Sequence, residues 1–459
     1  MTITKRIGMV SLVLGLVLGT GAVALGTAGD EPTRLGHGTG EEVKRISGSG
    51  KGMPSVRGPF PDTEGMEFLG QLTNAELGVE RLIYTGASWL SDIWGWTSPT
   101  TGDEYVIVGT SSGVAFVRIT DPADPEYLGI VPTTDPNTLR NFWWDIKTHA
   151  NHAYWTTEVN GAGVAIFDLT RLDSLGPVPA GTTLVENARY SGEGYIRAHN
   201  ISINEDTGRA LLTGVSKDPE VDPGFTDEGA VILDLNADPL APVEVGQILG
   251  IDSHDAQVVT YAGPDSDYVG ADIAFVFNGG DLEVGVYDVT DPGDIVEVAV
   301  ATYPGASFTH QGWLTEDHQY LLVGDEGDEL DGISDPQNPD LPDTARTYIF
   351  DVRDLDAPEF IGAFDSPAAS IDHNLFVKGD KVYQANYTAG VRVLDASQVE
   401  QGILTEIAHM DTEPRIPNTN MSRNINIFAG PWGVYPYFDS GTIAASDGLN
   451  GLVLMRLSD

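Results

Sequence analysis

The sequence predicts an all-β protein, a single seven-bladed β-propeller of four-stranded blades. Short apolar or β-branched runs, bounded by Gly, Pro, Asp or Asn, recur along the chain, as in VAIFDL, VGVYDV and VRVLDA. Long runs with the 3.6-residue period of a helix are almost absent from it. The chain of 459 residues is 41% hydrophobic, which is enough to bury a sizeable core.

A repeat along the chain predicts the number of blades. One marker residue stands just before the same strand of each unit, and successive markers lie 53 to 63 residues apart. The markers are Asp92, Asp145, His199, His254, His310, His373 and Trp432. Seven units of this length, each with four strand-like runs, are typical of propeller blades.

The two ends of the repeat predict how the ring closes. Fourth strands read EYLGIV, VEVGQIL and EFIGAF, but the last unit stops at its third strand, GLVLMRL. A run that matches the fourth strand, MEFLGQL, occurs at residues 66–72, before the first unit begins. We therefore expect this N-terminal strand to complete the last blade, which removes an open sheet edge.

The region before the propeller resembles a secretion signal followed by a leader. Lys5 and Arg6 precede an apolar run at residues 7–18, and small residues follow, with cleavage expected after Ala24 or Ala28. We expect a signal peptide over 1–28, a flexible Gly- and Ser-rich leader over 29–65, and the propeller over 66–459. The uncharged run is short for a membrane span, so a stable membrane anchor is not expected. The absence of cysteine excludes disulfides, thiolate metal sites and a bacterial lipid anchor.

The large negative net charge limits the classes of partner that the protein is expected to bind. The chain carries 24 Lys and Arg against 68 Asp and Glu, for a formal charge of -44. Because phosphate binding requires clustered basic residues, nucleic acid is excluded as a partner. The acidic excess favours solubility and cation binding in an extracellular medium. We expect a secreted monomer, extracellular or associated with a cell surface.

The motifs also resemble a known family. The third strand, which ends in Asp, is similar to the LVIVD repeat, and an ordered set of motifs from about Leu72 onward resembles the choice-of-anchor B family of secreted bacterial and archaeal proteins. The motifs are DIWGW, WDIK, AHNI, HDAQ, THQGWLTEDH, ARTYIFDV, DHNL and YQANYTAGVRVLD. The resemblance implies the LVIVD-repeat propeller and no particular reaction. Members carry varied C-terminal sorting signals, whereas this chain ends GLVLMRLSD, so release from the cell is expected.

Four histidines form a possible metal site. The first strand of each blade lines the central channel, so His199, His254, His310 and His373, which hold the same phase in four blades, should converge. Neutral imidazoles suit Fe, Cu, Mn or Zn, with Asp92 and Asp145 as further ligands or as acceptors behind the histidines. The alternative is a structural network in which these side chains hydrogen-bond to neighbouring blades or to channel water.

A second possible cation site lies in an acidic stretch at residues 324–340. Asp325, Glu326, Asp328 and Asp331 crowd a Gly-containing loop there, and calcium prefers carboxylate oxygens. The spacing does not match an EF-hand. In so acidic a chain, a carboxylate run is also typical of a solvated loop.

Two functions therefore remain open. The first is an extracellular binding or scaffold module for a glycan, a peptide or a surface protein. The second is a metal-dependent enzyme, an oxidoreductase or a hydrolase, with the four histidines as ligands. Imidazole nitrogens within roughly 3 to 3.5 Å of one another would favour the metal, since metal–nitrogen bonds are near 2 Å. The binding module is favoured, because a repeat explains the common phase without any chemistry.

Overall fold

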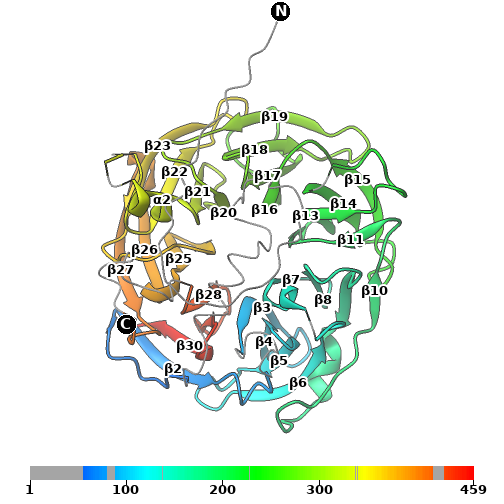
Figure 1. The fold of residues 1–459 in the computed structure, drawn as a ribbon, viewed down its shortest axis with the longest axis vertical. Coiled ribbons are helices and arrows are strands. Elements are labelled where there is room, and N and C mark those ends of the chain that lie inside the picture. The colour runs from blue at the N-terminus through cyan, green and yellow to red at the C-terminus, as the bar shows by residue number, and fades with distance from the viewer. Residues whose placement is uncertain are drawn as a thin grey trace, which may run out of the picture.

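Seven antiparallel sheets stand around a central axis like the blades of a propeller (Figure 1). The computed structural model describes residues 55–79, 88–136, 138–226, 228–335, 337–338, 340–416 and 428–458. The predicted fold class is confirmed. The predicted signal peptide and the leader up to residue 54 lie outside the described residues.

Each blade takes its strands in chain order from the channel outward, except the last. Blades one and two are β3 (Leu90–Thr97), β4 (Glu104–Thr110), β5 (Gly113–Arg118), β6 (Glu126–Pro132), and β7 (Trp144–His149), β8 (His152–Thr157), β9 (Val164–Asp168), β10 (Ala188–Tyr190). Blade three is β12 (Asn200–Asn204), β13 (Arg209–Lys217), β14 (Gly229–Asp234) and β15 (Val243–Ile248), and the additional strand β11 (Tyr195–Arg197) also pairs with β13. Blade four is β16 (Ser253–Thr260), β17 (Asp272–Asn278), β18 (Glu283–Asp288) and β19 (Val296–Ala301). Blades five and six are β20 (Thr309–Leu314), β21 (Tyr320–Asp325), β22 (Arg346–Asp351), β23 (Glu359–Asp365), and β24 (Leu375–Lys378), β25 (Lys381–Ala385), β26 (Val391–Gln398), β27 (Ile403–Met410). Blade seven is β28 (Pro431–Tyr435), β29 (Ile443–Asp447), β30 (Gly451–Leu457) and β2 (Met66–Leu72).

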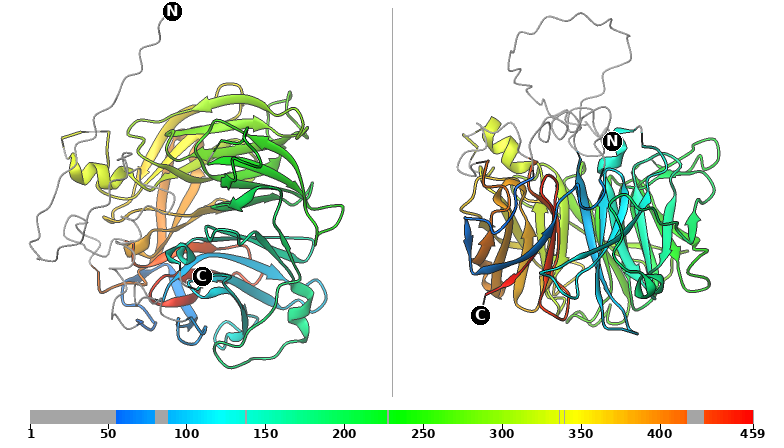
Figure 2. Two further views of the ribbon diagram at one scale, coloured as in Figure 1. Left: turned by 45° about the vertical axis from the view of Figure 1, so that its right-hand side comes forward. Right: turned by 90° about the horizontal axis from the view of Figure 1, so that it is seen from below.

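In the part of the chain that the structure describes, helical structure is confined to short segments. Segments of 3-10 helix occur at Leu139–Phe142, Leu169–Ser174, Tyr387–Ala389 and Val399–Gln401. The α-helix α2 (Asp328–Ser334) follows β21 and projects from one face of the disk (Figure 2). Among the described residues, no helix has the length and apolar character that a membrane span requires.

The ring closes with strands from both ends of the chain, as predicted. β2 pairs antiparallel with β30, with Met66 opposite Leu457 and Leu72 opposite Leu452. In Figure 1 the blue β2 runs along the outer edge of the blade that ends in the red β30. Blade seven is therefore held to the rest of the ring by backbone hydrogen bonds between the termini.

The chain ahead of β2 also packs on the propeller. A short strand, β1 (Thr63–Glu64), adds to the outer edge of blade six by pairing with β27. Gln71 Nε2 donates to the carbonyls of Val56 and Asn450, and the Val56 amide donates to Asn450 Oδ1. The packed part of the chain thus begins at least as early as Ser55, eleven residues ahead of the expected boundary at Met66.

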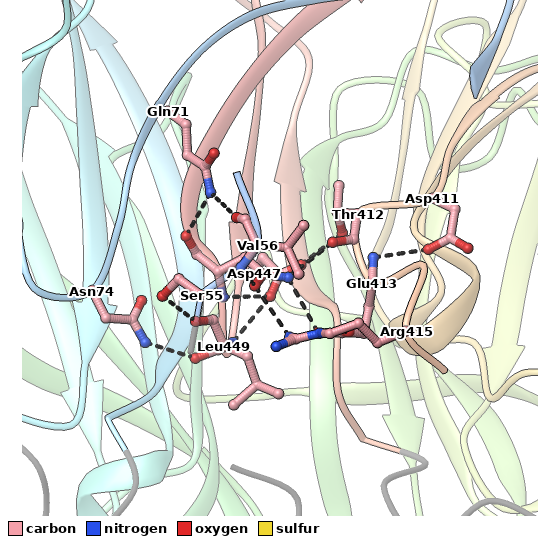
Figure 3. A network of polar contacts seen from close by, with 12 residues as sticks. Ser55, Val56, Gln71, Asn74, Asp411, Thr412, Glu413, Arg415, Asp447 and Leu449 are labelled. Atoms are coloured by element: carbon pink, nitrogen blue, oxygen red, sulfur yellow. Dashed lines mark hydrogen bonds and ion pairs between the residues drawn. The ribbon is translucent and has the colours of Figure 1, made fainter. Parts of the chain in front are cut away.

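These contacts belong to a buried polar network that joins blades six and seven (Figure 3). Its centre is Asp447, which accepts hydrogen bonds from the amides of Leu449 and Asn450 and from Thr412 Oγ1. Beside it, buried Glu413 is paired with Arg415. Burial, together with repulsion by Glu413, raises the pKa of Asp447 to about 7.

The glycine in each fourth-strand motif has a structural cause. Gly70, Gly129, Gly246 and Gly362 each lie where the ladder shifts register by a β-bulge. A Cβ on Gly246 would lie 2.4 Å from the carbonyl oxygen of Pro292, in the Asp-Pro turn of the next blade. Gly70 approaches the carbonyl oxygen of Pro122 in the same way, so in these two blades the glycine and the Asp-Pro turn of the next blade form one contact.

We expect Gly246→Ala to destabilise the protein by about 1–3 kcal/mol, because the added methyl group overlaps the backbone of blade four. Gly176→Ala is the matched control, since a Cβ there would meet nothing within 4 Å. Urea unfolding of both variants measures the difference. Equal stabilities for the two variants would contradict this explanation of the motif.

The stability of the native protein should depend on Asp447 at neutral pH. A raised pKa in the folded state contributes stability that is present below pH 4 and is lost as the pH rises through about 7, on the order of 1.4 kcal/mol for each unit of pKa difference. Asp447→Asn removes this ionisation, so the variant should lose less stability than the wild type between pH 5 and pH 8. Urea unfolding at both pH values checks this, with the exposed Asp294→Asn as control. A pH dependence identical to that of the wild type would refute the assignment.

Candidate functional site

The innermost strands of all seven blades line the channel with polar and aromatic side chains in layers. A small cavity of about 20 Å³, room for about one water molecule, lies among two of these layers. The side chains around it include all six of the predicted site residues that mark the inner strands: Asp92, Asp145, His199, His254, His310 and His373. The structure therefore brings these six residues together at the channel axis.

The four histidines form an arc of rings, one from each of blades three to six. Ring centroids lie 4.3 Å apart from His199 to His254, 4.5 Å from His254 to His310, and 4.3 Å from His310 to His373. Trp432 of blade seven continues the arc, 4.6 Å from His373. Neighbouring rings in this arc are tilted by 43° to 47° to one another.

Three of the imidazoles are also tied to specific oxygen atoms. His254 Nδ1 donates to the His310 carbonyl at 3.1 Å, and His373 Nδ1 donates to the Trp432 carbonyl at 2.6 Å. His199 Nδ1 lies 2.8 Å from the buried carboxylate of Glu158. Such bonds between blades are what the structural alternative requires.

The four histidines differ in whether their nitrogen atoms lie near a common set of possible metal ligands. Of the four, His310 and His373 belong to a set of three ligand atoms that all lie within 4.8 Å of one another in the described part of the chain, and the third ligand is Glu326. Burial lowers the pKa of His310 well below its ordinary value and that of His373 to about 3, so both imidazoles are neutral.

Asp92 and Asp145 lie in the neighbouring layer, around one buried cation. Lys147 Nζ lies 2.5 Å from Asp145 Oδ1 and 3.6 Å from Asp92 Oδ2, and 4.6 Å above the Trp94 ring. Burial raises the pKa of Asp92 well above its ordinary value despite the attraction of Lys147. Burial acts the same way on Asp145, but Lys147 outweighs it and the pKa of Asp145 is lowered. Lys147 thus favours the charged form of Asp145, whereas burial favours the neutral form of Asp92.

Hydrogen bonds to the next blade show the register of this layer. The Ile201 amide donates to Asp145 Oδ2, and the Leu375 amide donates to Gln311 Oε1 in the corresponding place. Asp145 is therefore the counterpart of Gln311, one residue beyond His310. The carboxylates serve as acceptors between blades in a layer next to the imidazoles.

The carboxylates of the expected calcium loop have separate partners. Asp325 accepts four backbone amides and the Tyr303 hydroxyl, and Asp328 accepts the Tyr348 hydroxyl at 2.6 Å. Asp331 accepts the Ser307 hydroxyl, whereas Glu326 faces the histidines. Calcium at this loop stays a prediction. Asp328 and Glu329 are buried on α2, and burial raises the pKa of both carboxyls well above the ordinary range.

A second cavity, of about 530 Å³, lies at the mouth of the channel where the inner strands end, and its lining includes none of the site residues predicted above. Every blade contributes to its lining. The aromatic residues are Trp94, Trp313, Tyr435 and Tyr437, and the polar ones include Lys147, Ser202, Asn204, Glu205, Asp206, Gln257, Thr260 and Glu316. The available signal was the pair of tryptophans two or three residues beyond the markers in blades one and five.

Comparisons with known proteins agree with the fold. No protein-family model matches the chain, and no curated protein matches it. The structure of U3-55K matches with a TM-score of 0.53 at 8% identity, covering 87% of this chain and 100% of that one. The RRP9 WD40 repeats match with 0.53 at 8% identity (88% and 100% covered), and a chain of the Mitotic Checkpoint Complex with 0.52 at 11% (89% and 97% covered). At such low identity these similarities show the seven-bladed propeller and assign no family.

Lys147→Met should destabilise the protein by about 3–5 kcal/mol at neutral pH, because Asp145 would be left buried without its cation. Lys381→Met, which removes a more exposed pair with Asp380, should cost less than about 1 kcal/mol. Unfolding in urea at pH 7 compares them. Adding Asp145→Asn to Lys147→Met should restore part of the loss, and a loss equal to that of Lys381→Met would exclude a structural role for the buried pair.

Proposed function

We propose that this protein is an extracellular binding module that takes a glycan into the cavity at the channel mouth. The observation that carries the proposal is the lining of that cavity, to which all seven blades contribute. Its volume of about 530 Å³ falls within the range of small-molecule pockets. A site built from every blade is held rigidly, because its walls are the ends of packed strands.

One wall of the cavity is aromatic. Trp94 packs edge-on against Tyr435 at 5.2 Å between centroids, and Tyr437 lies 5.4 Å from Tyr435. Trp313 packs against Phe376 and is partly exposed. Flat aromatic faces fixed by their neighbours offer apolar area at little entropic cost, which suits the C–H face of a sugar ring.

The remaining wall supplies hydrogen-bonding groups. Glu205, Asp206 and Glu316 are exposed there, and Ser202 and Thr260 add hydroxyl groups. Lys147 is the single Lys or Arg in the lining, and it is already paired with Asp145. Acceptor groups in excess suit a ligand rich in hydroxyl donors and oppose an anionic one.

The place of action is part of the proposal. A secretion signal at residues 1–28, the acidic surface and the resemblance to the choice-of-anchor B family support a secreted protein, acting as a monomer outside the cell. A peptide or a surface protein are the other partner classes. A glycan is favoured over them because the cavity pairs aromatic planes with hydrogen-bond acceptors.

Titration with neutral di- to tetrasaccharides, followed by intrinsic tryptophan fluorescence, tests the proposal. We expect saturable quenching, with the Kd raised at least tenfold, or about 1.4 kcal/mol, in Trp313→Leu. Trp96→Leu is the matched control, because Trp96 is also on an inner strand but packs against Tyr105, outside the cavity. No saturation with any sugar, or equal losses in both variants, would overturn the glycan assignment.

A further inference from the structure

We propose that His310, His373 and Glu326 bind one divalent transition-metal ion at the boundary between blades five and six. The site is independent of the glycan proposal, since none of the three residues lines the channel-mouth cavity. Each residue occupies a position where its strand begins or ends at the same level of the channel. His310 is on β20, Glu326 directly follows β21, and His373 precedes β24.

The geometry approaches that of a coordination site. His310 Nε2 lies 3.8 Å from Glu326 Oε2, and His373 Nε2 lies 3.9 Å from Glu326 Oε1. Bonds of about 2.0–2.2 Å at tetrahedral angles place ligand atoms about 3.4 Å apart. A shift of roughly half an ångström would bring both imidazole–carboxylate distances to this spacing. Glu326 is the residue able to supply that shift, because its side chain is 15% exposed while both imidazoles are almost fully buried.

Surrounding groups already orient the ligands. His373 Nδ1 donates to the Trp432 carbonyl, so the lone pair of this neutral ring is on Nε2, the atom that faces Glu326. The Tyr387 hydroxyl donates to Glu326 Oε1 at 2.5 Å and holds the carboxylate toward the histidines. Metal-binding histidines and carboxylates in proteins are typically held by such outer hydrogen bonds.

Electrostatics favour a cation at this position. His310 is 2% exposed, and its Nδ1 has no hydrogen-bond partner in the described part of the chain. The carboxyl group of Glu326 is the anionic partner in this set, and its two oxygens face the Nε2 atoms of the two imidazoles. Two imidazoles and one carboxylate suit Zn²⁺ or Fe²⁺ better than Ca²⁺, which prefers an all-oxygen site.

The other two channel histidines are excluded from this ligand set. Neither His199 nor His254 belongs to the group of described ligand atoms that all lie within 4.8 Å of one another. Three protein ligands leave a coordination position open, and the small cavity beside both imidazoles has room for one water molecule there. A bound ion would polarise that water as a Lewis acid.

The test is a Co²⁺ titration of the full chain, freed of metal by chelator and kept in excess Ca²⁺ to saturate surface carboxylates. We expect one Co²⁺ per chain with a visible absorption band that Zn²⁺ abolishes. Glu326→Gln and His310→Asn should weaken binding at least 100-fold. His199→Asn and His152→Asn, the latter at a partly exposed residue where β8 begins, should stay within about threefold of the wild type, which is under 1 kcal/mol.

Thermal unfolding separates lost ligands from lost structure. Zn²⁺ should raise the Tm of the wild type and of His199→Asn but not that of Glu326→Gln, whose Tm without metal should match the wild type. Binding lost equally in His199→Asn would show that four histidines hold the ion and overturn the three-residue site. Absence of stoichiometric Co²⁺, or binding unchanged in Glu326→Gln, would overturn the metal site altogether.

Discussion

Closure of the ring by β2 and β30 is the constraint on which the rest of the structure depends. Each blade buries its two faces against its neighbours, so an open ring would leave two apolar faces and a free sheet edge in water. The pairing of Met66 through Leu72 with the last strand removes both. The Asp447 network and the strand β1 then bind the N-terminal segment to blades six and seven. The channel exists only because the circle is complete.

Once the ring is closed, repetition places equivalent residues of every blade in layers around one axis. Most layer members serve the contact between blades. The amides of Ile201 and Leu375 find acceptors in the preceding blade, as buried backbone groups must. The imidazoles of His254 and His373 make the same kind of contact with backbone carbonyls. A residue that repeats in phase therefore has a structural reason to do so.

The two proposed sites, in contrast, lie at positions where the blades differ. Lys147 is a cation among amides and carboxyl groups, and its attraction outweighs burial and lowers the pKa of Asp145. Glu326 interrupts the repeat by approaching two histidines from the end of a second strand. The aromatic wall of the mouth is likewise confined to blades one, five and seven. Both proposed sites therefore depend on residues that the repeat does not reproduce in every blade.

The sequence by itself determined the blade number, the strand order and the closure of the ring. Strand periodicity, turn residues and repeat length are local properties, so they are visible along the chain without knowledge of the fold. It also indicated that the marker residues would meet at the axis. Tertiary structure decided which of them come close enough to act together, since a one-residue change of phase separates Asp145 from the histidine layer. It also decided that Glu326 belongs with His310 and His373 rather than with the acidic loop around it. Distances between side chains from different blades depend on how the sheets pack, and no spacing along the chain records that packing.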